Sequence, residues 1–266
     1  MGAGVLHAKA AAARFSLNRY PPPADLAPYV DFCWVLRWDL RGQPPHEQSI
    51  LPHPNVNLAF EATGAAVFGV DTKIFTRRLS GQGKALGIRF RPGGFRPFYG
   101  KPMSTLNDRV IPAHRILGLA ADQACAVIMA DTAGDAAMTE AAAGLLRAAR
   151  PAEDPVAEQA AELVSLITRD PGLYRVAQLA EVSGVPARQL QRLFADYVGV
   201  SPKWVMRRAR LHEAALRAEA DGTASVNWAE LAADLGYADQ AHLTRDFTAA
   251  IGIPPTRYAA GEPARA

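Results

Sequence analysis

Cysteine and long apolar runs are both scarce in this sequence. Only Cys33 and Cys125 occur among the 266 residues, too few for a disulfide framework. Because free cysteine is commonly buried, we expect both thiols to be structural. No apolar run approaches the length that spans a bilayer, and the first residues lack the charged and apolar regions of a signal peptide. These absences predict a cytoplasmic protein without a membrane partner.

Local motifs for catalysis and metal binding are also missing. His46, Glu47 and His53 lie close together in the sequence. A metal site on neighbouring strands would need His-x-His spacing with further ligands, so we assign these histidines to surface loops. The run Gly81–Lys84 lacks the spacing and the following Ser or Thr of a P-loop. Without a local nucleophile and base pair either, the sequence predicts no enzyme, no metal ion and no cofactor.

Positive charge is concentrated in two segments. The formal net charge is +3, although the chain from Pro151 onward carries 12 basic and 15 acidic side chains. Within that part, the segment from Arg188 to Arg217 holds seven basic side chains and two acidic ones. A second segment, from Lys73 to Lys101, holds eight basic side chains and no acidic one. Because a DNA backbone needs a positive patch and not a positive domain, the first segment fits a nucleic-acid surface.

The N-terminal part shows the alternation typical of β-strands. Phe32, Trp34, Leu36 and Trp38 alternate with other side chains, the period of a half-buried strand. Further short strands are expected around residues 56–60, 66–70, 73–79 and 86–90, and helical segments follow from residue 94. The first 15 residues are expected to be frayed. The predicted class is α+β, with a β-rich barrel or sandwich-like domain and its helical extension over residues 1–150.

Residues 154–260 are predicted to form an all-α domain of two helix-turn-helix units joined by a linker helix. In the first unit Gly184 supplies the turn, because glycine takes positive φ without strain. Leu190, Leu193 and Phe194 then fall three and four residues apart on one buried face. Leu179, Ala180 and Val182 are expected to give the preceding short amphipathic helix.

The second unit repeats this plan. Gly236 supplies the turn, and Asp239 is suited to cap the next helix. The exits Gly199–Pro202 and Gly252–Pro255 lie about 53 residues apart, which indicates an internal duplication. The expected buried face of the second helix consists of Leu243, Phe247 and Ile251. The linker helix is expected to turn inward Val205, Met206, Ala209 and Leu216.

The two units resemble the DNA-binding domain of the AraC/XylS family of transcription regulators. Two tandem units, each with a Gly-x-x-Pro exit, make the resemblance specific, and it covers about the last two-fifths of the chain. Ala259 departs from the family pattern, because a basic residue is usual there, and one phosphate contact is lost. The matching segments are Leu190–Phe194, Gly199–Pro202, Arg210-Leu211 with Ala214, Leu231-Ala232, Gly236–Gln240, Arg245–Phe247 and Gly252–Tyr258.

The resemblance implies which side chains of the two recognition helices contact double-stranded DNA in the major groove. Arginine can bond a guanine edge with two hydrogen bonds, and glutamine an adenine edge. In the first recognition helix the candidates are Arg188, Gln191 and Arg192. In the second they are Gln240, His242, Thr244 and Arg245. The alternative for each is an ordinary solvated helix face.

The linker helix adds further arginines, which cannot all face the same way at 3.6 residues per turn. We assign Arg207 to a DNA phosphate. Arg208 and Arg210 are further candidates for phosphate contacts, and for Arg210 the alternative is an internal ion pair with a helix end. Asp246, an acid beside the second recognition surface, is expected to turn sideways toward a basic neighbour.

The N-terminal region resembles the sensor regions of some regulators of this family. The segments that carry this resemblance are Tyr20-Pro-Pro, Leu51–Pro54, Gly69–Thr72 and Gly87–Gly94. Arg89 and Arg91 alternate with apolar residues inside the acid-free run, so they are predicted to share one strand face. We expect them to bind a small-molecule effector of anionic character. A solvated face and an extra DNA contact are the alternatives.

The sequence thus predicts a sequence-specific DNA-binding transcription regulator with an N-terminal sensing or dimerisation domain. Such a regulator is expected to have RNA polymerase and a second copy of the chain as further partners. Two alternatives stay open. One is an enzyme on the β-domain with a helical interaction module, which would place converging His, Asp or Glu side chains in the barrel. The other is a regulator without ligand sensing, whose barrel would be filled by side chains.

Overall fold

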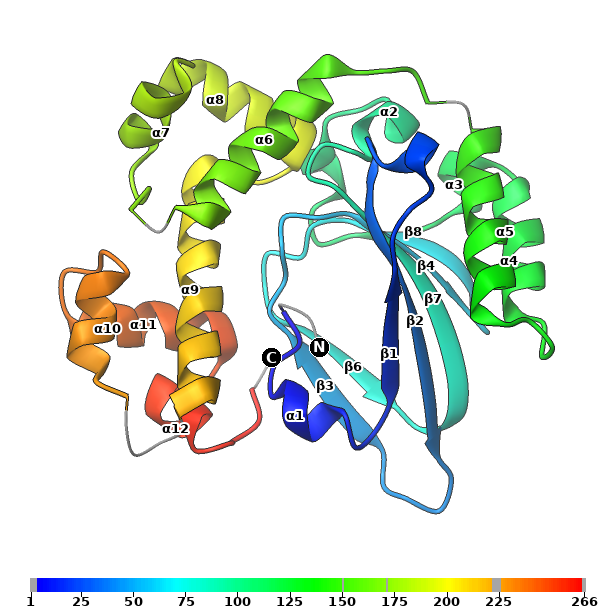
Figure 1. The fold of residues 1–266 in the computed structure, drawn as a ribbon, viewed down its shortest axis with the longest axis horizontal. Coiled ribbons are helices and arrows are strands. Elements are labelled where there is room, and N and C mark those ends of the chain that lie inside the picture. The colour runs from blue at the N-terminus through cyan, green and yellow to red at the C-terminus, as the bar shows by residue number, and fades with distance from the viewer. Residues whose placement is uncertain (1–3, 150, 171, 222–225, 265–266) are drawn as a thin grey trace.

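The computed structural model describes residues 4–149, 151–170, 172–221 and 226–264. It has the predicted α+β class, with a β-rich N-terminal part that carries its own helices and an all-helical C-terminal part (Figure 1). The chain passes from one part to the other between α5 (Asp135–Ala148) and α6 (Pro155–Arg169). None of the described helices is both long and apolar enough to cross a membrane.

Six antiparallel strands form a larger sheet, and two more form a smaller one. The larger sheet has the order β1 (Ser16–Tyr20), β2 (Val30–Leu40), β7 (Gly81–Phe90), β4 (Asn57–Glu61), β5 (Gly64–Phe68) and β8 (Val110–Pro112). The smaller sheet pairs β3 (His46–Ile50) with β6 (Phe75–Leu79). Because the larger sheet ends at β1 on one side and β8 on the other, it does not close into a barrel, and the sandwich-like form of the prediction is the closer one.

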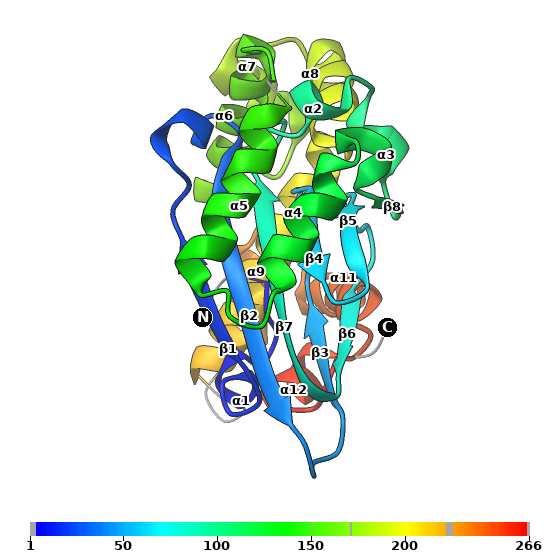
Figure 2. The same ribbon diagram turned by 90° about the vertical axis from the view of Figure 1, so that its right-hand side faces the viewer.

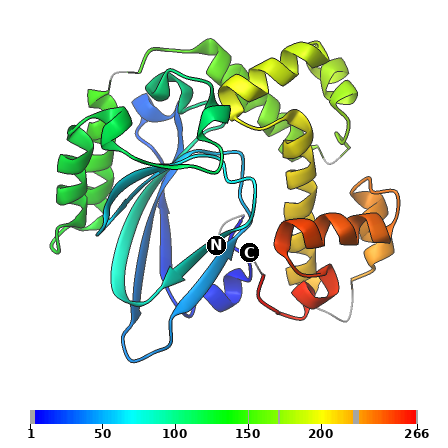
Figure 3. The ribbon, with the colours of Figure 1, turned by 180° about the vertical axis from the view of Figure 1, so that it is seen from behind.

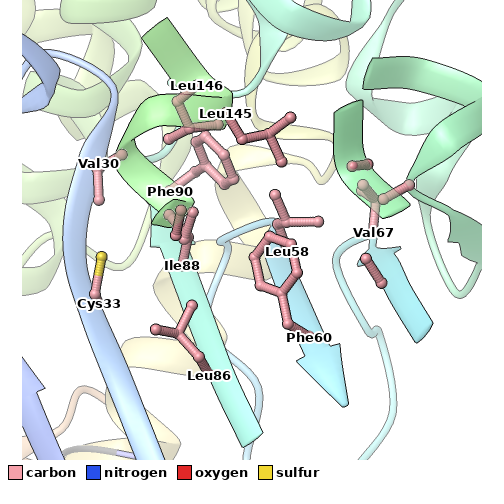
Figure 4. Packing of buried hydrophobic residues seen from close by; sticks show 14 of the residues in the cluster. Val30, Cys33, Leu58, Phe60, Val67, Leu86, Ile88, Phe90, Leu145 and Leu146 are labelled. Atoms are coloured by element: carbon pink, nitrogen blue, oxygen red, sulfur yellow. The ribbon is translucent and has the colours of Figure 1, made fainter. Parts of the chain in front are cut away.

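One face of the larger sheet packs against α4 (Ala120–Met129) and α5 (Figure 2). Side chains reverse direction at each residue of a strand, so alternate residues reach this face. In β2 they are Cys33 and Val35, and burial raises the pKa of the Cys33 thiol to about 11. Both cysteines are buried, as predicted. Figure 4 shows this core, in which the labelled residues are Val30, Cys33, Leu58, Phe60, Val67, Leu86, Ile88, Phe90, Leu145 and Leu146.

The opposite face of the sheet carries two tryptophans over two glycines. Trp34 of β2 is opposite Gly87 of β7, and Trp38 is opposite Gly83. A Cβ atom on Gly87 would lie 2.0 Å from Cζ2 of Trp34, and one on Gly83 would lie 2.3 Å from Cζ2 of Trp38. The two indole rings therefore lie against the backbone of β7, where a strand glycine permits such a close approach. We call Trp34 and Trp38 the indole floor.

Short helices connect the strands of the β-rich part. They are α1 (Ala8–Ala11), η1 (Ala24–Leu26), α2 (Arg96–Tyr99), η2 (Met103–Leu106) and α3 (His114–Leu117).

The first helix-turn-helix unit consists of α6, α7 (Val176–Ser183) and α8 (Ala187–Leu193), followed by the π-helical turn η3 (Phe194–Val198). Asp154 caps α6 by accepting hydrogen bonds from the backbone N–H groups of Val156 and Ala157. Gly184 makes the turn before α8 with φ of 68°, as predicted. The expectation for Val182 is wrong, because this side chain is 61% exposed on α7.

The second unit consists of α10 (Trp228–Asp234), α11 (Gln240–Ile251) and α12 (Pro255–Ala259). Asp239 caps α11, as predicted, because its carboxylate accepts a hydrogen bond from the backbone N–H of His242. The linker helix α9 (Pro202–Asp221) runs from the first unit to the second beside the β-rich part (Figure 3). Leu216 of α9 is 53% exposed and so departs from its predicted inward position.

The N-terminal segment from residue 4 is packed between the two parts, so the expectation of a frayed end is wrong from residue 4 onward. For residues 1–3 the expectation lies outside the described part of the chain. Val5 forms a β-bridge with Ile50, and Leu6 is 4% exposed in a core that also contains residues of the second unit. The backbone N–H of His7 donates to Glu219 of α9 at 2.8 Å. The sequence could not predict this packing, because Val5, Leu6 and His7 are consecutive residues. Contacts made by one face of a helix or strand would have appeared as a periodic pattern, and these do not.

The indole floor generates a stability prediction. Gly87→Ala places a methyl group into the Trp34 ring and is expected to lower the free energy of unfolding by about 1–3 kcal/mol, the usual cost of overpacking. The matched control is Gly144→Ala on α5, where an added Cβ meets nothing within 4 Å. This change should raise the free energy of unfolding by about 0.5–1 kcal/mol. Urea unfolding of both variants tests the pair, and equal stabilities would contradict the packing described here.

Candidate nucleic-acid interface and effector cavity

Helix α8 buries one apolar face and exposes polar side chains on the opposite face. Leu190 and Phe194 are fully buried, and this fixes the rotation of the helix. Arg188, Gln191 and Arg192 are consequently exposed. Within the described residues neither arginine is engaged in an ion pair or hydrogen bond, so both guanidinium groups are available to a partner.

Helix α11 presents a comparable surface. Leu243 and Phe247 are buried, whereas Gln240 and Arg245 are exposed, and Arg245 also lacks an ion pair among the described residues. Thr244 is half-buried. His242 is half-buried as well, with its ring edge-on to that of Tyr237 at 5.0 Å between centroids. The structure therefore offers Gln240 and Arg245 more freely than the other two candidates.

The arginines of α9 are largely engaged inside the protein. Arg207 Nη2 lies 3.1 Å from Asp246 Oδ1 on α11, so Asp246 turns to a basic neighbour as predicted. Arg210 Nη1 donates at 3.5 Å to the carbonyl groups of Leu235 and Gly236 at the end of α10, which matches the expected contact with a helix end. Arg207 remains 41% exposed, and its assignment to a phosphate remains a prediction.

The C-terminal part is docked on the β-rich part at both units. In the first, Arg96 Nε lies 3.1 Å from Asp196 Oδ1, and Asn107 Nδ2 donates to the carbonyl of Gly199 at 2.6 Å. In the middle, Arg208 of α9 donates to the carbonyl of Thr72 at 2.8 Å. The second unit shares a buried cluster with the β-rich part, which includes Leu6, Leu51, Leu211, Ala215 and Phe247.

A cavity of about 220 Å³ lies between the indole floor and the smaller sheet. Its walls are mostly apolar and aromatic, with contributions from Phe32, Phe75 and both floor tryptophans. The alternative of a regulator without ligand sensing predicted a β-domain filled by its own side chains. The open cavity does not fit that prediction. The acids on the wall do not converge: Glu61 is ion-paired with Arg77, and burial together with the charge of Asp108 raises the pKa of Asp71 to about 6.

Arg89 lies on the wall of this cavity. Its Nη2 donates to Asn55 Oδ1 at 2.8 Å, its Nε lies 3.3 Å from Asp31 Oδ2, and its guanidinium lies 5.3 Å from the centre of the Phe32 ring. Burial lowers its pKa from the ordinary value for arginine. Arg91 does not share this face, because β7 ends at Phe90 and the chain turns away there.

The histidines assigned to surface loops have other surroundings. His46 lies on β3. His53 lies on the cavity wall, and its ring stacks on that of His212 of α9 with 3.9 Å between centroids and 8° between planes. Sequence reasoning missed this pair because His53 and His212 are far apart in the chain. No cluster of three His, Cys, Asp or Glu side chains suited to a metal ion occurs in the described part of the chain.

Two family models match the chain. A helix-turn-helix domain matches residues 179–261, and a domain of unknown function (DUF6597) matches residues 18–112. No curated protein matches the sequence.

Solved structures of ToxT from Vibrio cholerae are similar in overall arrangement. One is 10% identical, with a TM-score of 0.39, and the match covers 92% of this chain and 98% of that one. ToxT bound to (E)-4-(8-methylnaphthalen-1-yl)but-3-enoic acid is 10% identical, with a TM-score of 0.41 and the same coverage. ToxT with a bound unsaturated fatty acid is 9% identical, with a TM-score of 0.38, covering 92% of this chain and 95% of that one.

The helix-turn-helix match begins within α7 and covers α8, the linker helix, the second unit and both exits that carry the family pattern. Together with the exposed polar faces of α8 and α11, it establishes a DNA-binding domain of the AraC type. The C-terminal part of the chain therefore carries a helix-turn-helix domain of the AraC type.

Proposed function

We propose that this regulator reads a specific operator sequence with both recognition helices and responds to a small-molecule effector held in the cavity of the β-rich part. The observation that carries the first half is the set of exposed, unengaged side chains on both α8 and α11. The second half rests on an open cavity whose walls also touch the DNA-binding part.

Base reading is assigned chiefly to Arg188, Gln191, Arg192, Gln240 and Arg245. Their apolar neighbours on the same helices are buried, so the packing fixes the face of each helix from which these side chains project. This pre-organisation favours bidentate contacts with base edges in the major groove. Two such helices on one chain would occupy successive groove segments about one helical turn apart.

The effector is assigned to the cavity over the indole floor. Flat aromatic walls favour a ligand with a planar apolar body, because such rings stack with offset faces. Arg89 supplies a cation on the wall that can hold an anionic group. Its partner Asp31 is 44% exposed at the side chain, and a ligand anion that is better shielded from solvent would compete with it for the guanidinium.

Cavity occupancy can reach the DNA-binding part through three neighbours of the wall. Val5 lines the cavity, and the next residue, Leu6, packs with the second unit. Asp71 lines the cavity, and the next residue, Thr72, accepts the hydrogen bond from Arg208. His53 lines the cavity and stacks on His212. A displaced wall would therefore change the contacts of α9, which joins the two units.

Substitutions on the recognition helices test base reading. Arg192→Ala is expected to weaken operator binding by roughly 1–3 kcal/mol and to change binding to random duplexes little, because a base contact carries sequence information. Arg245→Ala should do the same at base positions about one helical turn away. The operator is first selected from random duplexes, and affinities are then measured over a salt series, in which binding should weaken as salt rises.

The matched control is Arg169→Ala, which changes an exposed arginine at the end of α6 that belongs to neither recognition helix and should leave the preference for the operator unchanged. Equal losses on operator and random DNA for Arg192→Ala would assign this residue to positioning and not to reading. Thermal unfolding of each variant must stay near that of the parent chain.

A second set of substitutions tests the effector site. A panel of aromatic carboxylates and their neutral amides is screened for a rise in the melting temperature of the full chain, since a ligand that binds the folded state stabilises it. Arg89→Gln should abolish the rise produced by a carboxylate and preserve DNA binding. Arg91→Gln, outside the cavity, is the control and should keep the rise. Loss of the response in both variants, or in neither, would contradict the assignment.

A further inference from the structure

A second cavity of about 220 Å³ lies along α9, between the two helix-turn-helix units. The first unit contributes apolar walls at Ile167 and Leu173, and the second contributes Leu235. The half-exposed Leu216 of α9 stands at its edge. From the β-rich part, His53 and Pro54 complete the wall. We call this space the linker groove.

Arg208 lines the linker groove and is 5% exposed. Its Nη2 donates to the carbonyl of Thr72 at 2.8 Å, and its guanidinium lies 4.6 Å from the centre of the Trp204 ring. Its Nη1 is buried and has no hydrogen-bond partner among the described residues. The described part of the chain also places no carboxylate in an ion pair with it. Buried arginine is ordinarily paired, so this group lacks its usual counterion.

The charge of Arg208 is retained at neutral pH. Burial and the neighbouring charge of Arg207 lower its pKa to about 10, which still leaves it protonated. A buried cation with a donor left over is unfavourable unless an anion accepts from it. The carbonyl group of Thr72 and the ring of Trp204 compensate part of this cost. The Nη1 donor that remains indicates that an anion from outside the chain binds here.

Most other polar groups of the groove are already engaged within the protein, although the buried Nε of Arg210, which also lines the groove, has no hydrogen-bond partner among the described residues. Glu213 is ion-paired with Arg217 at 2.8 Å, and Asp170 accepts the backbone N–H of Gly172 at 2.8 Å. Burial lowers the pKa of His212 to about 3, so its ring is neutral and does not compete for an anion. What the groove offers a ligand is therefore the free Nη1 donor of Arg208, the free Nε donor of Arg210 and apolar walls.

We propose that the linker groove is a second ligand site, which binds a small organic monoanion with a compact apolar body and places the anionic group on Arg208. Such a ligand touches both helix-turn-helix units at once, so it fixes how they sit relative to each other. It is separate from the effector cavity, with which it shares the wall residue His53. The proposal stands whether or not the first cavity binds an effector.

Calorimetric titration of the full chain with cyclohexanecarboxylate tests the site, with cyclohexanecarboxamide as the neutral analogue. The carboxylate is expected to bind, and the amide to bind at least about tenfold more weakly, the loss usual for a hydrogen bond to a charged group. Arg208→Met removes the cation and keeps most of the apolar stem, and it should weaken carboxylate binding by a similar factor. The fluorescence of Trp204, which lies beside Arg208, should change on binding to the parent chain.

Two further variants make the result specific. Ala209→Leu fills the groove without changing a charge and should also abolish binding, which keeps the test valid if Arg208→Met does not fold. Arg89→Gln alters the first cavity alone and should leave binding unchanged. Loss of binding in Arg89→Gln with retention in Arg208→Met and Ala209→Leu would place the carboxylate in the first cavity and overturn the proposal. Absence of any binding to the parent chain would overturn it as well.

Discussion

The docking of α9 on the β-rich part is the interaction on which the rest of the molecule depends. Helix α9 carries side chains that belong to the cores of both helix-turn-helix units, Met206 in the first and Leu211 in the second. The side chains of Arg208 and His212, one turn apart on the same helix, rest on Thr72 and His53 of the β-rich part. Because both of these contacts adjoin the cavity over the indole floor, the position of the linker helix and the shape of that cavity are physically connected.

The C-terminal part could be predicted closely from the sequence because its signals are local. A glycine turn, an aspartate cap and apolar residues three and four apart specify each unit without reference to the remainder of the chain. Gly184, Asp239 and Phe247 occupy their predicted places for this reason. Val182 and Leu216 were predicted to be buried but are exposed. Both lie at the edge of an apolar helix face, and whether such an edge is buried depends on other parts of the fold that the periodicity does not specify.

In the β-rich part the class and the approximate positions of several strands were predictable, but not how the strands pair. The alternation of Trp34 and Trp38 indicated a strand, but not that this face would line a cavity while Cys33 and Val35 pack against helices. The indole floor depends on Gly87 and Gly83, about 50 residues further along the chain, and such pairings are fixed by strand register. The same limit applies to Arg208, whose burial without a counterion arises from packing against a distant loop.

The central claim is that both recognition helices of one chain read DNA together. A base-resolved footprint of the full chain on its selected operator measures this most directly. The account predicts two protected major-groove segments on the same side of the duplex, with centres about one helical turn, or roughly 10 base pairs, apart. A single protected segment, or protection that extends evenly along the duplex with no base preference, would contradict it.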